Sequence, residues 1–456
     1  MTGARRRIAV ITPDVLAQRM AGPAIRAWNI AAALATAGHQ VSLVSAAKCS
    51  IDSPDFDCRF VAWHALERFC EGFDVLVVQG FVTYHAPGLL SGPAVLVVDL
   101  YDPLQFEQLE QLRGVPEIRR RSTIDRTVRV LNAQAVRGDF FLCASEEQRQ
   151  LWLGLLGAFG RINPLTYDRD PSLRRLIDVV PFGLADQPPA RRAPAVRGVV
   201  EGISETDTLV LWAGGVYDWF DPLTLLRAIA LLAPRRPDLR LFFMGMVHPN
   251  SDVGEMSMAG RTRALADELG LTGRHVFFNE DWVAFDDRGD YLLEADLGVS
   301  THFDHAETAF AFRTRMLDYL WAGLPIVATE GDTFARLITS EGLGRTVPEQ
   351  QPEALAAALE AVLYDPEVAA SCRQRVAEVA PGFQWSRTLA PLVAFCEDPV
   401  RAIDTGLDAQ RMVRRPVPSP SQAVRAVGRA RELLGEGGSA LLLTRVRGKL
   451  GRRRAR

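Results

Sequence analysis

Several features are scarce in this chain of 456 residues. It has six cysteines, and none of them forms a CxxC pair or lies at metal-ligand spacing from a histidine. Isolated cysteines in apolar segments mostly act as small buried side chains. The sequence therefore excludes a disulfide framework and fits a reducing cytoplasm. No apolar run reaches the roughly 18 residues that a membrane-spanning helix needs.

Two motifs are also missing near the N-terminus. Arg5, Arg6 and Arg7 are followed by a short apolar run and then Pro13-Asp14, rather than by the apolar core of a signal peptide. The loop between Pro13 and Gly22 contains no GxGxxG pattern. This absence argues against a flavodoxin-like or dinucleotide-binding redox protein.

Excess charge of one sign is absent from the chain as a whole, whose formal net charge is −3. A nucleic-acid binder usually carries a clear positive excess, so this class is disfavoured. The charge is unevenly distributed: residues 401–456 hold 14 Lys and Arg against 4 Asp and Glu, a net of +10, which leaves −13 for residues 1–400. A basic segment with apolar residues at helical spacing suits an anionic membrane surface. A disordered soluble tail and a helix packed back on the N-terminal domain are the alternatives.

Short apolar runs alternate with helical patterns along the rest of the chain. Buried apolar strands separated by helices indicate parallel sheets covered on both faces. The sequence predicts strands at 8–12, 41–44, 75–78, 95–98, 140–144, 179–181, 209–213, 241–244, 276–278, 297–300, 326–329 and 345–347.

A Pro- and Arg-rich stretch at 186–198 interrupts this series. We expect an α/β protein with two facing doubly wound Rossmann-like domains, and a ligand cleft between the carboxyl ends of their strands. The predicted divisions are an N-terminal Rossmann-like domain at 1–184, a linker at 185–207, a C-terminal Rossmann-like domain at 208–398 and a basic tail at 399–456.

Residues 296–330 carry the most specific pattern. A strand, a polar loop and a helix over 314–322 bring Arg315 and Asp318 onto one helical face, three positions apart. A helix N-terminus with an adjacent arginine favours phosphate, and a carboxylate one turn later suits ribose hydroxyls. The plainer interpretation is an ordinary αβ unit with a surface ion pair.

The pattern Thr314-Arg315-x-x-Asp318-Tyr319-x-x-Ala322-Gly323-x-Pro325 resembles the donor-site block of retaining GT-B glycosyltransferases of family 4. Many members have two glutamates eight positions apart. The second falls on Asp318, but strict counting places the first on Phe310. The nearest carboxylate, Glu307, is expected to contact the transferred sugar if the loop is three residues longer.

Other segments agree with this resemblance in part. Gly22, Gly214 and Gly215 match loop glycines that let the backbone approach the donor, although the usual Gly-Gly of the first loop is Gly22-Pro23 here. The Arg and Lys that normally grip the diphosphate after the strand at 209–213 are missing. The resemblance therefore implies phosphate binding by Arg313 and Arg315, a different donor, or a loss of activity.

The remaining candidates follow strand ends. Asp99 and Asp102 lie where the family has residues that face the acceptor, and His85 is a second candidate for that side. Trp282 is expected to stack on the nucleobase. Asp102, Glu307 and Arg315 are the candidate catalytic residues, and no metal site is expected.

The resemblance implies transfer of a sugar from a nucleoside-diphosphate sugar to a hydroxyl of a glycan or lipid-linked acceptor, with retention and without a cofactor. Polysaccharide assembly in the cytoplasm, with peripheral contact to the membrane, is the expected setting. A non-catalytic GT-B partner subunit and a nucleotide-sugar epimerase remain the alternatives.

Overall fold

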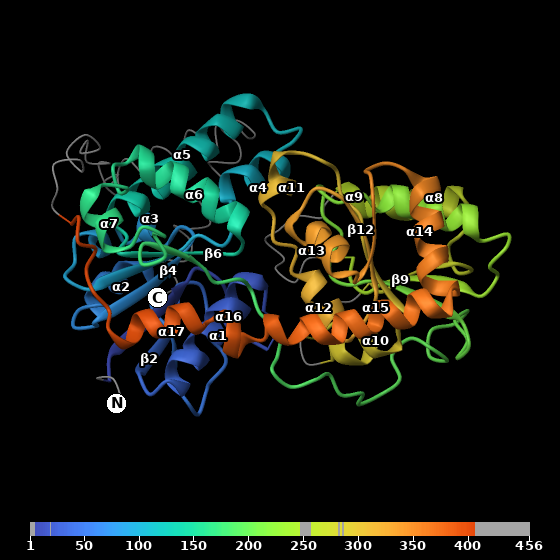
Figure 1. Ribbon diagram of the computed structural model, residues 1–456, viewed down its shortest axis with the longest axis horizontal. Coiled ribbons are helices and arrows are strands. Elements are labelled where there is room, and N and C mark those ends of the chain that lie inside the picture. Colours follow the sequence, from blue (N-terminus) through green and yellow to red (C-terminus); the bar gives the residue numbers. More distant parts are fainter. Residues whose placement is uncertain (1–4, 19, 247–256, 281–282, 285–286, 406–456) are drawn as a thin grey trace, which may run out of the picture.

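The computed structural model describes residues 5–18, 20–246, 257–280, 283–284 and 287–405. These residues form two α/β domains that lie side by side (Figure 1). Each domain contains one parallel sheet. The predicted fold class is therefore confirmed.

The N-terminal sheet has the order β3-β2-β1-β4-β5-β6-β7. Its strands are β1 (Arg7–Thr12), β2 (Gln40–Ser45), β3 (Asp57–Phe60), β4 (Val75–Gln79), β5 (Val95–Asp99), β6 (Phe140–Cys143) and β7 (Ile177–Val179). Its helices are α1 (Gly22–Thr36), α2 (Trp63–Phe69), α3 (Val82–His85), η1 (Pro87–Leu90), α4 (Leu104–Gln111), α5 (Glu117–Arg137), α6 (Glu146–Ala158) and α7 (Pro164–Arg169).

The C-terminal sheet has the order β10-β9-β8-β11-β12-β13. Its strands are β8 (Thr208–Trp212), β9 (Leu239–Phe243), β10 (Val276–Phe278), β11 (Leu297–Ser300), β12 (Ile326–Thr329) and β13 (Gly344–Val347). The helices that follow are α8 (Pro222–Leu232), α9 (Ser257–Glu268), α10 (Arg288–Glu294), α11 (Ala306–Phe310), α12 (Arg315–Trp321), α13 (Thr333–Glu341), α14 (Pro352–Tyr364), α15 (Pro366–Val379), η2 (Ala380–Phe383), α16 (Trp385–Thr388) and α17 (Ala390–Glu397).

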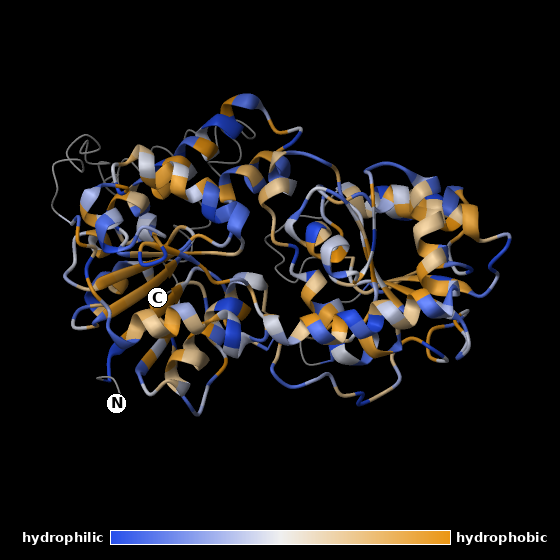
Figure 2. Ribbon diagram, viewed as in Figure 1, coloured by the Kyte–Doolittle hydropathy of each residue, from blue (hydrophilic) through white to orange (hydrophobic). Residues whose placement is uncertain are grey.

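Alternation along each strand supplies both faces of a sheet with apolar side chains. In β1, Ile8 and Val10 face the layer that contains α1 and α17, whereas Ala9 and Ile11 face the layer that contains α5 and α6. The central strands are accordingly apolar throughout in the hydropathy view (Figure 2). This burial on both sides is the reason why apolar runs predicted the strands well.

One strand was not predicted. Strand β3 (Asp57–Phe60) lies at the edge of its sheet and is half-buried to exposed. Because only one side of it is paired, its sequence needs no apolar run, and the pattern used for the other strands could not detect it.

The chain crosses between the domains twice at neighbouring points. Leu184 donates its amide to the Phe383 carbonyl, and Trp385 donates its amide to the Leu184 carbonyl, at 2.8 and 3.0 Å. A side chain at Gly183 would meet the Trp385 ring at 2.6 Å, so the two crossing segments can pass only because this residue is glycine.

After the second crossing, α17 packs on the N-terminal domain, where Phe395 stacks on Phe140 at 4.3 Å between ring centroids. Helices α16 and α17 thus lie against the N-terminal domain (Figure 1). The end of the C-terminal domain at residue 398 stays a prediction. The tail after residue 405 lies outside the described residues. Within the described part, no helix is long and apolar enough to span a membrane.

Candidate functional site

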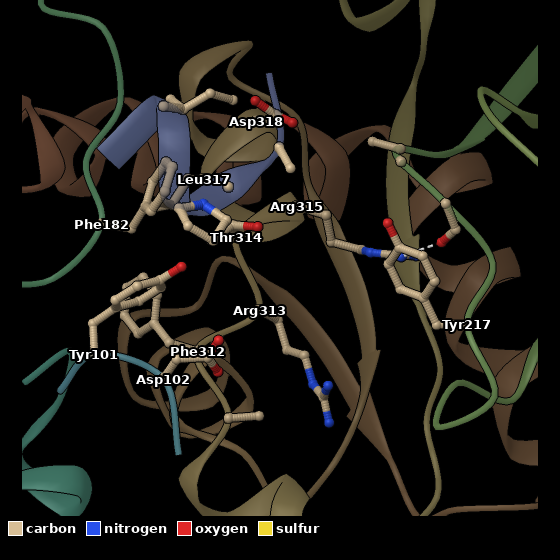
Figure 3. A pocket seen from close by; sticks show the side chains of 18 of the residues that line it. Tyr101, Asp102, Phe182, Tyr217, Phe312, Arg313, Thr314, Arg315, Leu317 and Asp318 are labelled. Atoms are coloured by element: carbon tan, nitrogen blue, oxygen red, sulfur yellow. Dashed lines mark hydrogen bonds between the residues drawn. The ribbon is translucent and has the colours of Figure 1, made fainter. Parts of the chain in front are cut away.

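A cavity of about 410 Å³ lies between the two domains. Its walls come from segments that follow β1, β5 and β7 on one side and β8, β9 and β11 on the other. Parallel sheets place ligands at these carboxyl ends, near the point where strand order reverses. The site predicted from the sequence therefore corresponds to a real cavity (Figure 3).

Arg315, the first residue of α12, is the best-defined group in this cavity. Its guanidinium carbon lies 4.3 Å from the Trp212 ring centroid and 4.0 Å from that of Phe220. One terminal nitrogen, Nη2, donates to the Gly215 carbonyl at 2.7 Å. The aromatic faces and the carbonyl fix the direction of the side chain.

The other terminal nitrogen of Arg315, Nη1, is buried and has no hydrogen-bond partner in the described structure. Burial lowers the pKa of Arg315 to about 10, so the group is still a cation at pH 7. A buried donor without a partner costs about 1–3 kcal/mol. An anionic oxygen in the cavity would remove that cost.

The loop after β8 lacks the Arg and Lys that the resemblance leads us to expect there. Asp221 lies in the loop where the resemblance leads us to expect a cation. It caps α8 by accepting hydrogen bonds from the Thr224 amide and hydroxyl at 3.1 and 2.6 Å. Phe220 instead contributes a wall of the aromatic box around Arg315. The loop therefore contributes one of the two rings that hold Arg315, and the end of β8 contributes the other, Trp212.

Gly214 and Gly215 both line the cavity, as predicted. Gly214 has a φ of +83°, which favours glycine. A β-carbon on Gly215 would lie 2.9 Å from the Tyr217 ring. Gly22 also lines the cavity at the start of α1, with nothing within 4 Å of an added β-carbon.

Arg313 and Glu307 also line the cavity, but they bind each other. Two parallel hydrogen bonds of 3.0 and 2.7 Å join the guanidinium to the carboxylate, and both side chains are buried. Asp332 lies 3.9 Å behind the Arg313 Nε. Arg313 is thus neutralised by carboxylates, and Arg315 is the stronger candidate for phosphate.

The start of α12 offers fewer free amides than the sequence suggested. The amides of Met316 and Leu317 already donate to the carbonyls of Arg313 and Thr314, both at 3.0 Å. Asp318 lines the cavity and accepts from Arg288 Nε at 2.9 Å. Burial raises the pKa of Asp318, while Arg288 opposes that shift.

Across the cavity, Asp102 lies with a carboxyl group that the sequence did not single out, Glu107. Burial raises the pKa of Asp102 to about 6; the charges of Glu307 and Asp99 act in the same direction, and Glu107 opposes the shift. The pKa of Glu107 is raised well above its usual value by burial and by Asp102. Two carboxyl groups that influence each other in this way titrate as a pair.

Asp99 and His85 do not line the cavity, contrary to the predicted acceptor contacts. Asp99 is buried at the end of β5 and accepts from Arg26 Nε and Nη2 at 2.7 and 2.9 Å. The same Arg26 Nη2 donates to the Val180 carbonyl at 2.8 Å. His85 stacks on Trp63, with 4.4 Å between centroids. Neither side chain is therefore placed at the cavity, because sequence position does not show which way a strand-end side chain turns.

Trp282, the predicted base-stacking residue, lies outside the described residues. Among the residues that sequence reasoning missed, Glu107 had a signal, because it lies in the first turn of the helix that follows Asp102. Arg288 had none, since it reaches the cavity from α10. No group of three His, Cys, Asp or Glu in the described part of the chain could hold a metal ion.

The buried Arg26–Asp99 pair gives a first prediction. We expect Asp99→Ala to lower the free energy of unfolding by about 3–5 kcal/mol, because it leaves a buried guanidinium without its partner. The matched control is Asp57→Ala, which breaks an exposed pair with Arg59 and should cost less than about 1 kcal/mol. Urea unfolding measures both; equal small losses would contradict a structural role for Asp99.

The carboxyl pair gives a prediction on pH. Because the folded-state pKa of Asp102 is raised to about 6 from 3.8, its protonation stabilises the fold below about pH 4, and that contribution is lost as the pH rises through 6. Glu107 acts in the same direction. The double variant Asp102→Asn, Glu107→Gln removes both titrations.

We therefore expect wild type to lose on the order of 2 kcal/mol of stability relative to this variant between pH 4.5 and 7.5. Urea unfolding at the two pH values gives the difference. A difference that is independent of pH, or of opposite sign, would show that the two carboxyl groups ionise normally.

Comparison with known proteins agrees with this geometry. Residues 207–365 match a sequence model described as glycosyl transferases group 1. No curated protein matches the sequence. Solved structures do match this chain, and three of them are described here by their TM-score, sequence identity and coverage.

The sucrose-phosphate synthase of Thermosynechococcus elongatus aligns with a TM-score of 0.59 at 16% identity, over 86% of this chain and 98% of its own. WaaG, a glycosyltransferase involved in lipopolysaccharide biosynthesis, gives 0.58 at 17%, over 86% and 100%. HepE of Anabaena, solved with UDP-glucose, gives 0.62 at 13%, over 87% and 100%. At these identities the matches show the fold, and the fold is GT-B. The chain thus has the GT-B fold, and its residues 207–365 match the group 1 glycosyltransferase family.

Proposed function

We propose that the protein transfers a sugar from a nucleoside-diphosphate sugar to a hydroxyl of a glycan or lipid-linked acceptor, with retention of the anomeric configuration. The observation that carries this proposal is Arg315. It is a buried cation, held in an aromatic box beside two glycines, with one N–H lacking a hydrogen-bond partner. Arginine forks suit the oxygens of a diphosphate.

The comparisons support a nucleotide-sugar donor. Arg315, Gly214 and Gly215 all lie within residues 207–365, the part that matches the group 1 family. HepE, a structural neighbour, was solved with UDP and glucose and with UDP-glucose. We place the diphosphate of this protein's donor between the glycine loop and Arg315, and the ribose beside Asp318.

The residues of the cavity suggest how the reaction proceeds. As the bond from the anomeric carbon to the diphosphate breaks, Arg315 stabilises the growing negative charge on the leaving oxygen. Asp102 and Glu307 supply carboxyl groups near the sugar. No dedicated nucleophile is assigned, and retention then implies attack of the acceptor hydroxyl from the side that the diphosphate leaves, with the hydroxyl proton passing to an oxygen of the leaving diphosphate. We propose that this reaction uses arginine in place of a metal ion and needs no cofactor.

Two alternatives remain under the same fold. A putative UDP-N-acetylglucosamine 2-epimerase of Listeria monocytogenes aligns with a TM-score of 0.52 at 12% identity, so the fold does not separate an epimerase from a transferase. A non-catalytic partner subunit would need no donor. The built cation site at Arg315 favours a protein that binds a nucleotide.

The proposed setting is assembly of a polysaccharide or lipid-linked glycan at the inner face of a membrane. The supporting feature is the net charge of +10 in residues 401–456, most of which lie outside the described structure. Contact with an anionic surface would be electrostatic and would weaken with salt.

A binding experiment tests the donor site. Thermal unfolding is followed with UDP, GDP, dTDP, ADP and CDP in turn. A nucleotide at about 100 times its Kd should stabilise the fold by roughly 2.7 kcal/mol. We expect one nucleotide to raise the Tm of wild type, Arg315→Ala to abolish that shift, and Arg315→Lys to keep part of it, because lysine retains the charge without the fork.

The matched control is Arg227→Ala, an exposed arginine of α8 outside the cavity, which should respond to nucleotide as wild type does. If no nucleotide raises the Tm of wild type, the protein is better described as a non-catalytic subunit. A shift that survives in Arg315→Ala would place the diphosphate elsewhere.

A further inference from the structure

Arg313 and Arg315 lie two positions apart, and their side chains leave the chain in different directions (Figure 3). Arg315 is the proposed ligand of the donor diphosphate. Arg313 is also buried in the wall of the cavity, but carboxylates lie beside both its Nη atoms and its Nε atom. Carboxylates repel phosphate, so the position of Arg313 points to another role.

The terminal nitrogens of Arg313 hold Glu307. Nη1 donates to Oε1 at 3.0 Å, and Nη2 donates to Oε2 at 2.7 Å. The Phe220 ring lies beside the guanidinium, with its centroid 5.1 Å from the central carbon. A carboxylate has about four lone-pair sites, and a paired contact of this kind uses about half of them. Glu307, which lines the cavity, therefore keeps acceptor capacity for the hydroxyls of a ligand.

The Nε atom of Arg313 faces a second acid, Asp332, in the loop between β12 and α13. Its Oδ2 lies 3.9 Å from Arg313 Nε and 3.4 Å from His302 Nε2. Asp332 and His302 are completely buried, and none of these three atoms has a hydrogen-bond partner in the described structure. Away from water, charges act on each other more strongly at such distances than they do at the surface. Asp332 therefore pulls on the end of Arg313 that points away from Glu307.

Asp332 and His302 are themselves fixed by the fold. The other oxygen of Asp332, Oδ1, caps α13 by accepting from the Ala335 amide at 2.7 Å. The His302 amide donates to the Thr329 hydroxyl at the end of β12, at 3.2 Å. Arg313 is thus held between a carboxylate that is anchored beside the sheet and a carboxylate that faces the cavity.

The ion pair limits what Glu307 can do chemically. A cation engages both of its oxygens, which makes the carboxylate a poorer nucleophile and a weaker source of negative charge for a cationic sugar. The acceptor capacity that remains has a fixed direction, because Arg313 is fixed. Fixed hydrogen-bond acceptors orient a sugar through its hydroxyls and hold its anomeric carbon in the reacting position.

We propose that Arg313, Asp332 and His302 form a positioning unit, which directs Glu307 at a hydroxyl of the transferred sugar and takes no part in binding the diphosphate. This inference rests on the proposed function, because it assumes a nucleotide-sugar donor. It gives a role in sugar recognition to Asp332 and His302, which are not among the described residues that line the cavity.

Saturation-transfer NMR on the full-length protein tests the contact with the sugar. The probes are UDP-glucose, UDP-galactose, GDP-mannose, dTDP-glucose, ADP-glucose and CDP-glucose. For each probe, the signal transferred to the protons of the sugar is divided by the signal transferred to the protons of the base. This sugar-to-base ratio reports how closely the protein contacts the sugar, whatever the affinity for the nucleotide. We expect wild type to saturate both groups of protons in at least one probe.

Variants with that probe separate positioning from stability. Asp332→Asn and Asp332→Ser both remove the charge and keep a good helix cap. Each should lower the sugar-to-base ratio at least threefold, as Glu307→Gln should, with the base still saturated. The double variant Glu307→Gln, Asp332→Asn should match Glu307→Gln, because Asp332 acts through Glu307. The matched control is Asp365→Asn, the cap of α15, which should keep the ratio of wild type.

The outcomes distinguish this inference from the proposed function. If wild type saturates the base of no probe, the proposed function fails, and the positioning unit fails with it. If the base is saturated, three results overturn the positioning unit alone. They are a wild type that contacts no sugar, Asp332 variants that keep the ratio of wild type, and a double variant whose ratio falls well below that of Glu307→Gln. Loss of the base signal in Asp332→Asn would also overturn it, because Asp332 would then support the diphosphate site.

Discussion

The arrangement of the donor wall depends on one interaction, the capture of the Arg315 guanidinium between Trp212 and Phe220. It links the first residue of α12 to the end of β8 and to the loop behind it. The rings exclude water from the cation but offer their electron-rich faces in exchange. An arginine that is desolvated, charged and fixed in direction is suited to bind a diphosphate, because little reorganisation is needed when the ligand arrives.

This interaction also explains why the usual cations could be lost from the loop after β8. In this chain the loop carries aromatic residues and a helix-capping aspartate, which in sequence look like the loss of a phosphate site. In three dimensions the rings surround a cation that another segment provides. The cation at this wall of the cavity is Arg315, which α12 supplies 100 residues after Gly215.

The sequence predicted the sheets well because strands buried on both faces must be apolar, and apolar runs are easy to find. It also predicted that Gly22, Gly214, Gly215, Asp102, Glu307, Arg313, Arg315 and Asp318 would gather in one place, and all eight line the cavity. It could not show how these groups pair. Arg313 is neutralised by Glu307, and Asp99 is used by Arg26, because partners brought together only by folding decide whether a charge remains available.

Burial accounts for the residues that sequence reasoning missed. Glutamate and arginine are common on protein surfaces, so Glu107 and Arg288 do not stand out in the sequence. Folding places them in the cavity lining, where Glu107 influences Asp102 and Arg288 binds Asp318. The result is a cavity in which two of the three arginines on the C-terminal wall are paired with carboxylates, which leaves Arg315 as the cation without an acidic partner among the described lining residues.

The most direct test is a crystal structure of the protein with the nucleoside diphosphate that stabilises it. The account predicts phosphate oxygens within hydrogen-bond distance of Arg315 Nη1 and of the backbone amides at Gly214 and Gly215, with Trp212 and Phe220 still flanking the guanidinium. A diphosphate bound at Arg313 after its separation from Glu307, or bound outside the cavity, would contradict it.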